Sequence, residues 1–546
     1  MSGWDVAGAS LTAVLALPLI AILVIAARGG DGVWPHLVST VLPASFANTM
    51  LLMSGAGAGA LFLGAGAAWL VTMHRFPGRD IADRLLVLPL AMPLYIVAYA
   101  YVDLLDYAGP VQTSLRAAFG WSSISDYYFP DIRSLGGAAL LFSFVLYPYV
   151  YLTARASFEQ QSVCVLEVAR TLGRTAGETF WAVALPLARP ALAAGVALVA
   201  METLNDLGAV QYLGVETLSA SIYATWLQRA SLPGAAQISV VLLVIVIALM
   251  LGERALRGGG STQATTGRYR AIPFEELDGW RGWAALALAL APALIGFVIP
   301  FASLAAQAVD RLDQGASAGF YRAAFNSLAL SSLVAAVAVL AALTIAYAMR
   351  VSRGLSTRIA NAAASFGYAL PGAVLAIGLM APLAAFDNGV DAWMRGAFGV
   401  STGLIFSGSL FAVTLALVIR FLAVAIGSVD AGLQRISPNL DAAARTLGVS
   451  GGAALFRVHL PMLAPALGAA ALLVFVDAMK ELPATLLLRP FNFETLATHV
   501  YGLAAAEAFE EAALGAVTIV LIALAPALWL HKAVSEGRAG SGSRGR

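Results

Sequence analysis

The chain has 546 residues, of which 60% are hydrophobic and 12% are charged, and its formal net charge is +1. A soluble domain carries roughly 25% charged residues, so this composition excludes an ordinary soluble protein, and the small net charge excludes a strongly basic surface for nucleic acid. We therefore predict an all-α integral membrane protein that lies in a lipid bilayer and binds no nucleic acid.

Twelve apolar stretches follow one another along the chain, each close to the ~20 residues that a helix needs to cross a bilayer. They cover 9–28, 47–73, 82–104, 136–156, 189–207 and 236–253 in the first half, and 283–305, 325–349, 361–384, 403–427, 463–480 and 512–531 in the second. Arginines concentrate in segments that follow every second stretch, which predicts that these segments and both termini face the cytoplasm. The expected location is the bacterial inner membrane.

A charged segment after the fourth stretch occurs again in the second half. Residues 166–173 read Leu-Glu-Val-Ala-Arg-Thr-Leu-Gly, and residues 441–448 read Asp-Ala-Ala-Ala-Arg-Thr-Leu-Gly. The two glycines are 275 positions apart (448 − 173), and so are the prolines of the Leu-Pro that follows each copy (461 − 186). This shared register indicates a duplicated unit.

Further matches extend the repeat over most of each half. With an offset of 278 (326 − 48), Asn48-Thr49 matches Asn326-Ser327, Pro93 matches Pro371, and Glu216-Thr217-Leu218 matches Glu494-Thr495-Leu496. We expect a first half at 1–257, a cytoplasmic linker at 258–282, and a second half with a short cytoplasmic tail at 283–546. Because each half has an even number of spans, the two copies are expected to insert in the same orientation.

The sequence contains no motif for nucleotide binding or catalysis. A phosphate-binding P-loop needs Gly-Lys-Ser/Thr, whereas the two lysines lie in Met-Lys480-Glu and His-Lys532-Ala. We expect a transporter that is not an enzyme and that binds no cofactor of its own. Any energy for uphill transport must come from another subunit or from an ion gradient.

Each repeated segment predicts two short helices with a bend at the glycine, a compact projection suited to docking. Its pattern, Glu-x-Ala-x-x-x-Gly followed by Val-x-Leu-Pro, resembles the EAA loop of ABC importer permeases, with loops at about 156–188 and 428–463. The resemblance implies two fused six-helix type I permease halves. It also implies a cytoplasmic ATPase dimer that hydrolyses ATP and docks on both loops, and a periplasmic substrate-binding protein.

The coupling residues follow from that resemblance. They are Glu167, Ala169, Arg170, Gly173 and Pro186 in the first loop, and Asp441, Ala443, Ala444, Arg445, Gly448 and Pro461 in the second. The second loop departs from the family pattern, because Ala442 stands at the glutamate position and Asp441 lies one place earlier. We therefore expect the two loops to couple unequally.

A second resemblance concerns the substrate. Residues 201–217 and 477–498 are similar to segments of fused permeases from the ferric-iron importer group, which implies import of ferric iron. Related permeases for thiamine, polyamines or phosphonates share much of this pattern and remain alternatives. An ion-coupled secondary transporter is the alternative from another class, and it would need no docking loops.

Four acidic residues are candidates for the translocation path. Glu202 and Asp206 are four residues apart, and Asp477 and Glu481 occupy the matching positions of the second half. A charged group at the centre of a membrane helix costs about 2.5–3.5 kcal/mol, so such residues usually have a function, and carboxylates suit a hard cation. The alternative is that they pair with Lys480 or cap helix ends. No metal site is firmly assigned.

Overall fold

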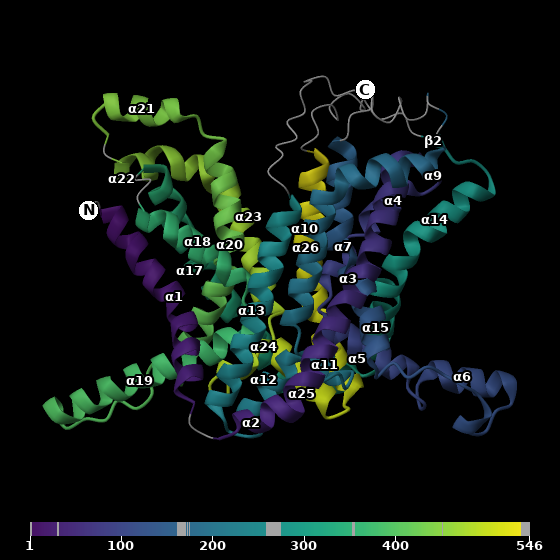
Figure 1. The fold of residues 1–546 in the computed structure, drawn as a ribbon, viewed down its shortest axis with the longest axis horizontal. Helices are drawn as coiled ribbons and strands as arrows, with labels where there is room; N and C mark the ends of the chain where they lie inside the picture. Colours follow the sequence, from purple (N-terminus) through teal and green to yellow (C-terminus); the bar gives the residue numbers. More distant parts are fainter. Residues whose placement is uncertain are drawn as a thin grey trace. The chain divides into compact units, whose positions relative to one another are not determined.

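The computed structural model describes residues 3–29, 32–160, 171, 173, 175–257, 275–351, 355–449 and 451–536. These residues are almost entirely helical (Figure 1). The chain forms two compact units. Unit 1 contains Met1–Val41, Ser221–Leu243 and Ala316–Gly502, and unit 2 contains Leu42–Ala220, Val244–Gly315 and Leu503–Arg546.

Unit 1 begins with the N-terminal helix and is otherwise built mainly from the second half of the sequence. Its elements are α1 (Gly3–Arg28), α2 (Trp34–His36), η1 (Leu37–Val41), most of α12 (Leu218–Leu227), the first part of α13 (Leu232–Arg257), α17 (Ala318–Val351), α18 (Leu355–Ala369), α19 (Gly372–Phe398), α20 (Leu410–Gln434), α21 (Pro438–Thr446), α22 (Gly451–Ala454), η6 (Leu455–His459), α23 (Leu460–Met479), α24 (Pro483–Leu488) and most of α25 (Leu496–Ala505).

Unit 2 is built mainly from the first half of the sequence. Its elements are α3 (Leu42–Met73), β1 (His74–Arg75), α4 (Arg79–Leu85), η2 (Leu88–Ala91), α5 (Leu94–Leu105), α6 (Pro110–Phe119), η3 (Ile124–Asp126), α7 (Leu135–Gln160), α9 (Ala176–Thr179), η4 (Phe180–Ala184), α10 (Leu185–Asn205), α11 (Gly208–Tyr212), the last part of α13, β2 (Glu275–Glu276), α14 (Trp280–Ala293), η5 (Leu294–Val298), α15 (Ile299–Asp310), α16 (Leu312–Gly315) and α26 (Phe509–Glu536). The two-residue strands β1 and β2 pair in parallel.

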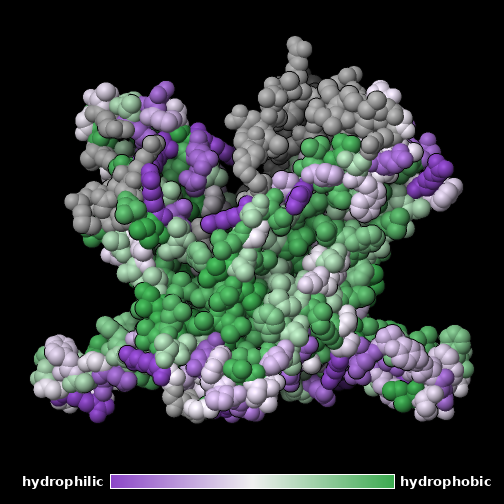
Figure 2. Space-filling model, viewed as in Figure 1, coloured by the Kyte–Doolittle hydropathy of each residue, from purple (hydrophilic) through white to green (hydrophobic). Residues whose placement is uncertain are grey.

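The prediction of an all-helical membrane protein is confirmed. Among the described residues, ten helices are long and apolar enough to cross a membrane, or eleven if one bent pair is a single span. These agree in position with eleven of the twelve predicted stretches, and the last stretch, 512–531, lies within α26. Hydrophobic residues cover the middle of the helices, and hydrophilic residues gather toward their ends (Figure 2).

Two of the predicted spans, 82–104 and 361–384, are wrong as single straight helices, because both are interrupted at a proline. Pro93 stands before α5 with φ −59° and ψ 142°, and Pro371 stands before α19 with φ −58° and ψ 141°. Proline has no N–H to continue a helix, and it drives the preceding residue toward an extended conformation. In unit 2 the helical segments on either side, Arg79–Ala91 and Leu94–Phe119, meet at 98°.

The compact units do not follow the two sequence halves. The N-terminal helix α1 packs against α17, α18 and α19 of unit 1, and a Cβ on Gly378 would lie 2.5 Å from the carbonyl oxygen of Pro18. In unit 2, α15 packs on α5, and Gln307 Nε2 donates to Asp103 Oδ2 at 2.6 Å. Each unit therefore combines a core from one half with the first long helix of the other, while the division into halves at 1–257 and 283–546 stays a proposal.

Close helix packing in unit 2 depends on glycine. The helices α3, α7 and α10 form its centre, and a Cβ on Gly64 of α3 would lie 2.8 Å from the backbone oxygen of Tyr147. A Cβ on Gly195 of α10 would lie 2.8 Å from the Cα of Val150. In lipid, where helices associate largely through van der Waals packing, small residues permit this approach.

Two side chains of α3 in unit 2 hydrogen-bond to the backbone at the start of α12. Asn48 Nδ2 donates to the carbonyl oxygen of Glu216 at 3.1 Å, and the N–H of Leu218 donates to Thr49 Oγ1 at 3.0 Å. Thr49 and Leu218 are both buried. The side chains thus satisfy backbone groups that have no helical partner.

Unit 1 repeats this arrangement at the matching positions. Asn326 Nδ2 donates to the carbonyl oxygen of Glu494 at 2.9 Å, and the N–H of Leu496 donates to Ser327 Oγ at 2.7 Å. The four residues are those that the 278-residue offset matched with the first half. We call each of these paired hydrogen bonds a backbone tie; the two ties support the duplication.

We expect Thr49→Val and Ser327→Ala each to destabilise the protein by about 1–3 kcal/mol, because each leaves a buried backbone N–H without its acceptor. Thermal unfolding of the purified protein in detergent measures the effect. Thr344→Val is the matched control, since the half-buried Thr344 donates to the carbonyl oxygen of Leu340 in its own helix and accepts from no backbone N–H of another segment in the described part of the chain. Equal stability of all three variants would contradict a stabilising role for the backbone ties.

Candidate functional site

The second coupling loop contains the predicted bend between two short helices. The first helix, α21, ends at Thr446, and Gly448 follows with a φ of 73°, a left-handed conformation that glycine adopts without strain. The N–H of Val449 donates to the carbonyl oxygen of Ala444 at 2.9 Å. The chain then enters α22 and η6, and Pro461 lies in the first turn of α23.

Asp441, at the first turn of α21, is bound by two cationic or polar side chains of unit 1. Arg350, near the end of α17, places Nε 2.9 Å and Nη2 2.7 Å from Asp441 Oδ2. His459 Nε2 lies 2.8 Å from Oδ1 of the same carboxylate. Arg350 also donates to the carbonyl oxygens of Leu433 and Ile436 at 2.7 and 3.0 Å. This fork-shaped contact, which we call the Arg350 clamp, fixes α21 to α17 and to the end of α20.

The first coupling loop is described only in part. Glu167, Ala169 and Arg170 lie outside the described residues. Gly173 has a φ of 81°, which is the same left-handed bend as that of Gly448. After it, Thr175 and Glu178 form a reciprocal cap at the start of α9: the N–H of Thr175 donates to Glu178 Oε2 at 2.8 Å, and the N–H of Glu178 donates to Thr175 Oγ1 at 3.3 Å.

The remaining predicted coupling positions lie where the motif expects them. Pro186 stands in the first turn of α10, as Pro461 does in α23. Ala443 and Ala444 lie within α21, and Ala444 is buried whereas Ala443 is exposed. Arg445 also belongs to α21.

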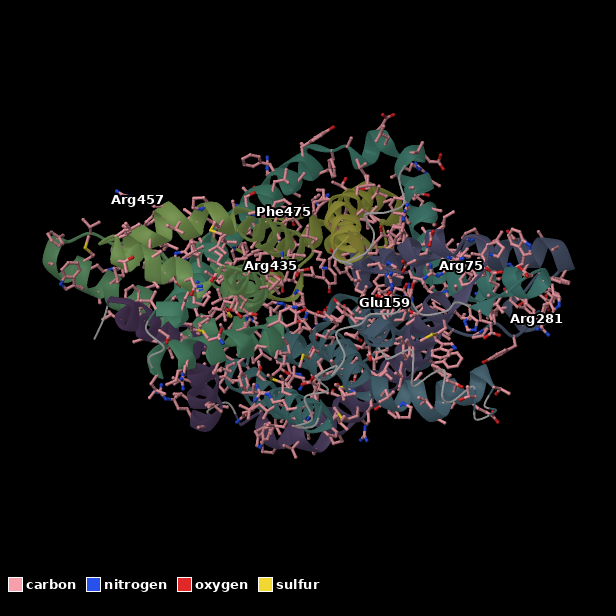
Figure 3. The ribbon with its side chains drawn as sticks, turned by 90° about the horizontal axis from the view of Figure 1, so that it is seen from above. Arg75, Glu159, Arg281, Arg435, Arg457 and Phe475 are labelled. Carbon is pink, nitrogen blue, oxygen red and sulfur yellow. The ribbon has the colours of Figure 1, made fainter. Side chains whose placement is uncertain are left out.

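An ion-pair network of unit 2 joins the end of α7 to α4. Arg155, near the end of α7, is 2.6 Å from Asp83 of α4 and 3.0 Å from Glu159, and the hydroxyl of Tyr151 donates to Asp83. Figure 3, a view from above, labels Glu159 in unit 2 and Arg435 and Arg457 in unit 1. In unit 2 this network therefore fixes α7 to α4. In unit 1 the Arg350 clamp binds Asp441 of the second loop.

Two of the four predicted translocation acids cap short helices, in the same way in each half. Asp206 Oδ1 accepts from the N–H groups of Ala209 and Val210 at 2.9 and 3.1 Å, at the start of α11. Glu481 accepts from the N–H groups of Ala484 and Thr485 at 2.8 and 3.0 Å, at the start of α24. A carboxylate at this position satisfies free amide groups and the helix dipole.

Glu481 also has a cationic neighbour. Arg420, in the middle of α20, places Nη1 3.4 Å from Glu481 Oε1, and both residues are buried. A Cβ on Gly372 would lie 2.6 Å from that carboxylate oxygen, so only glycine leaves room for the pair. Asp477 is 2.9 Å from Lys480 Nζ, the pairing that the sequence offered as an alternative. Glu202 is half-buried near Asp206.

Unit 2 contains a cluster of tyrosines and one aspartate that the sequence did not predict. Tyr95, Tyr99 and Asp103 follow one another at four-residue spacing along one face of α5, and Tyr99 interacts electrostatically with Asp103 and with Tyr212 of α11. In the described part of the chain, the buried hydroxyls of Tyr99 and Tyr212 have no hydrogen-bond partner. The ring of Phe509 stacks on Tyr99 at 6.2 Å. We call Tyr99, Asp103 and Tyr212 the tyrosine cluster.

The tyrosine cluster has no counterpart in the second half. At the offsets of the repeat, Tyr99 corresponds to Ile377 (377 − 99 = 278) and Tyr212 to Leu487 (487 − 212 = 275). The four-residue spacing was the only signal that sequence offered. Over the described ranges, no three His, Cys, Asp or Glu side chains gather in a way that could hold a metal ion.

Comparisons with known proteins agree with the loop motif. Residues 60–257 match the family model described as the binding-protein-dependent transport system inner membrane component. The Fe(3+)-transport system permease protein FbpB 2 of Haemophilus influenzae is 25% identical over 491 residues, which is 89% of each chain. A second protein of that organism, named as a ferric transport system permease (FbpB 1), is 23% identical over 86% of this chain and 75% of its own length.

A shorter relative covers one half only. The sulfate transport system permease protein CysT of Escherichia coli is 27% identical over 256 residues, which is 45% of this chain and 87% of its own length. Most of this shorter relative thus matches about half of the present sequence, in agreement with the duplication. Taken together with the two bent loops, these matches agree with an inner-membrane permease of a binding-protein-dependent transport system, whose family model covers residues 60–257 of this chain.

Proposed function

We propose that this permease imports ferric iron. The observation that carries the proposal is the similarity over 89% of both chains to a ferric-iron permease. The sulfate permease matches less than half of the chain. A protein named as a putative 2-aminoethylphosphonate transport system permease is 27% identical over 42% of the chain, so a phosphonate is the second candidate.

Oxygen donors in unit 2 support a hard cation as the substrate. The tyrosine cluster supplies two phenol oxygens and one carboxylate, and the carboxylates of Glu202 and Asp206 lie in the same unit. Hard cations bind oxygen ligands in preference to sulfur. We propose that these groups of unit 2 contact the ion during transport. For unit 1 we propose separately that Asp477 and Glu481 do so.

The partners follow from the family. A permease of this kind works with an ATPase that hydrolyses ATP and with a substrate-binding protein. We infer that the ATPase is a cytoplasmic dimer docked on the loops at about 156–188 and 428–463, that the binding protein is periplasmic, and that both termini are cytoplasmic. In the second loop, Asp441 is held by the Arg350 clamp.

Substrate identity is tested by iron uptake in cells that lack other ferric importers. We expect the wild type to accumulate radioactive ferric iron and not 2-aminoethylphosphonate. Tyr99→Phe combined with Tyr212→Phe removes two oxygen donors and should lower uptake at least about tenfold, a loss equivalent to about 1.4 kcal/mol.

Tyr101→Phe is the matched control, because Tyr101 lies on the same helix but donates to the backbone oxygen of Ile295 at 2.6 Å. Phosphonate uptake in place of iron uptake would contradict the proposed substrate. Full iron uptake by the double variant would exclude the tyrosine cluster as an ion contact but would leave ferric iron as the proposed substrate.

The two roles of Asp206, as a helix cap and as a charge on the path, give different results in two substitutions. Asn keeps a side-chain oxygen that caps α11, whereas Ala removes it at a cost of about 1 kcal/mol. If the charge contacts the ion, Asp206→Asn should retain thermal stability and lose iron uptake. Full uptake by Asp206→Asn with reduced stability of Asp206→Ala would show that the residue is only a cap.

The Arg350 clamp is tested by Arg350→Met. Because a hydrogen bond to a charged group contributes about 1.5–3 kcal/mol, we expect faster hydrogen exchange in α21 and weaker co-purification of the ATPase. Arg435→Met is the control, since Arg435 lies exposed between α20 and α21. Unchanged exchange and unchanged co-purification in Arg350→Met would mean that the clamp does not position the loop.

A further inference from the structure

Each unit carries a helical arm that transport does not explain. In unit 2 it is α6 with the turn after it, residues 110–128, and in unit 1 it is the last part of α19 with its return segment, residues 386–409. Within its own unit, each arm projects from the end opposite the coupling-loop helices, α9 in unit 2 and α21 in unit 1 (Figure 1). With the coupling loops in the cytoplasm, as proposed above, both arms belong to the periplasmic end.

The arms are part of the duplication. Residues 116–120 read Arg-Ala-Ala-Phe-Gly, and residues 395–399 read Arg-Gly-Ala-Phe-Gly, at an offset of 279 (395 − 116). Both helices end at the glycine, which has a φ of 70° in each arm. Its N–H donates to the carbonyl oxygen of Arg116 in one arm and of Arg395 in the other.

In the arm of unit 2, the polar face of the helix binds the segment that returns to the body. Arg116 Nη1 donates to the hydroxyl oxygen of Tyr127 at 3.0 Å, and that hydroxyl donates to Gln112 Oε1 at 2.6 Å. Trp121 stacks between Phe119 and Tyr127, with ring centroids at 4.8 and 4.7 Å. The polar face is therefore occupied from within.

The arm of unit 1 uses the matching face in the same way. Asp391 accepts from the N–H of Thr402 at 2.7 Å and is 2.6 Å from Arg395 Nε. One turn earlier, Asp387 accepts from the N–H groups of Phe406 and Ser407 at 2.9 and 2.7 Å. Positions 391 and 395 correspond to 112 and 116 of the other arm at the 279-residue offset.

Each arm also exposes apolar side chains. On α6, Val111, Leu115 and Phe119 recur every four residues beside the polar face; Val111 and Leu115 are half-buried, and Phe119, which stacks on Trp121, is 64% exposed. On α19, Phe386 and Trp393 lie on the side of the helix away from Asp387 and Asp391, and they are 58% and 64% exposed. Figure 2 shows hydrophobic and hydrophilic residues mixed over both projections.

The chemistry of the arms fits the boundary between lipid and water. Each holds Phe and Trp, whose rings favour the headgroup level of a bilayer, and an amphipathic helix with such a face lies in the plane of the interface. In unit 2, N–H groups of Ser123 and Ser122 donate to Asp126 and lower its pKa, so this carboxylate stays charged and marks the side of the arm that faces water. Formal charges almost cancel: Arg116 and Asp126 sum to zero in one arm, and Asp387, Asp391 and Arg395 leave −1 in the other.

We propose that both arms lie in the periplasmic membrane interface, with their apolar faces at the boundary between phospholipid headgroups and acyl chains. Because the arms carry almost no net charge, zwitterionic phospholipid is a sufficient partner. The arms continue α5 and α19, the helices that begin at Pro93 and Pro371, so they fix these broken segments to the lipid surface. The orientation rests on the proposed function, whereas the contact with lipid rests on the arms themselves.

Spin labels on single cysteines test the contact in phosphatidylcholine nanodiscs. The native Cys164 is replaced by Ser, and labels are placed on the apolar faces by Phe119→Cys and Trp393→Cys. Matched labels on the exposed polar sides come from Thr113→Cys and Asn388→Cys. We expect the apolar-face labels to collide with oxygen, which concentrates in lipid, and to be shielded from a water-soluble nickel chelate, with the reverse for the control labels.

Equal exposure of all four labels to the nickel chelate would overturn the lipid contact. Shielding of the apolar-face labels only after the periplasmic binding protein is added would overturn it too, because that protein would then be the partner. An impermeant thiol reagent tests the orientation separately. Labelling of Thr113→Cys only from the cytoplasmic side would refute the proposed topology and with it the periplasmic placement.

Discussion

The structure depends on satisfying backbone polar groups in a medium that offers no water. Wherever a membrane helix breaks, its free N–H and C=O groups must find partners inside the protein. The backbone ties of Asn48-Thr49 and Asn326-Ser327 provide them before α12 and α25. Asp206 and Glu481 do the same where α10 and α23 give way to the short helices α11 and α24. These interruptions recur at matched positions, so the two halves share the places where helices end and the side chains that bind the free backbone groups there.

The described parts of the two halves differ in several polar contacts. The Arg350 clamp holds the loop of unit 1, whereas unit 2 has an ion pair between membrane helices at the corresponding end, Arg155 with Asp83. Asp206 stands at the position that matches Glu481 of the buried Arg420–Glu481 pair, and it caps α11. The apolar residues Ile377 and Leu487 stand at the positions that match Tyr99 and Tyr212 of the tyrosine cluster.

The sequence predicted what short-range patterns encode. Hydrophobic runs located the spans, and the Ala-Arg-Thr-Leu-Gly segments with their following prolines located two loops whose glycines are left-handed in the structure. It missed what depends on packing between distant segments. The match of Pro93 with Pro371 did not reveal that each breaks a span. Nothing local in α1 indicates that it packs on α17 to α19, because uniformly apolar helices have no preferred face. Tyr99 was likewise not predicted, because its apolar helix gave no sign of which face would meet Tyr212.

We infer that this chain forms the membrane-spanning path of the importer and that a separate ATPase, docked on its two loops, supplies the energy for transport. The most direct test is iron accumulation in proteoliposomes that contain the permease and the binding protein, with the ATPase present or omitted. We expect iron to accumulate only when both the ATPase and ATP are present. We also expect that ionophores that collapse proton and sodium gradients leave this accumulation unchanged. Accumulation without the ATPase, driven by such a gradient, would contradict it and would indicate a secondary transporter.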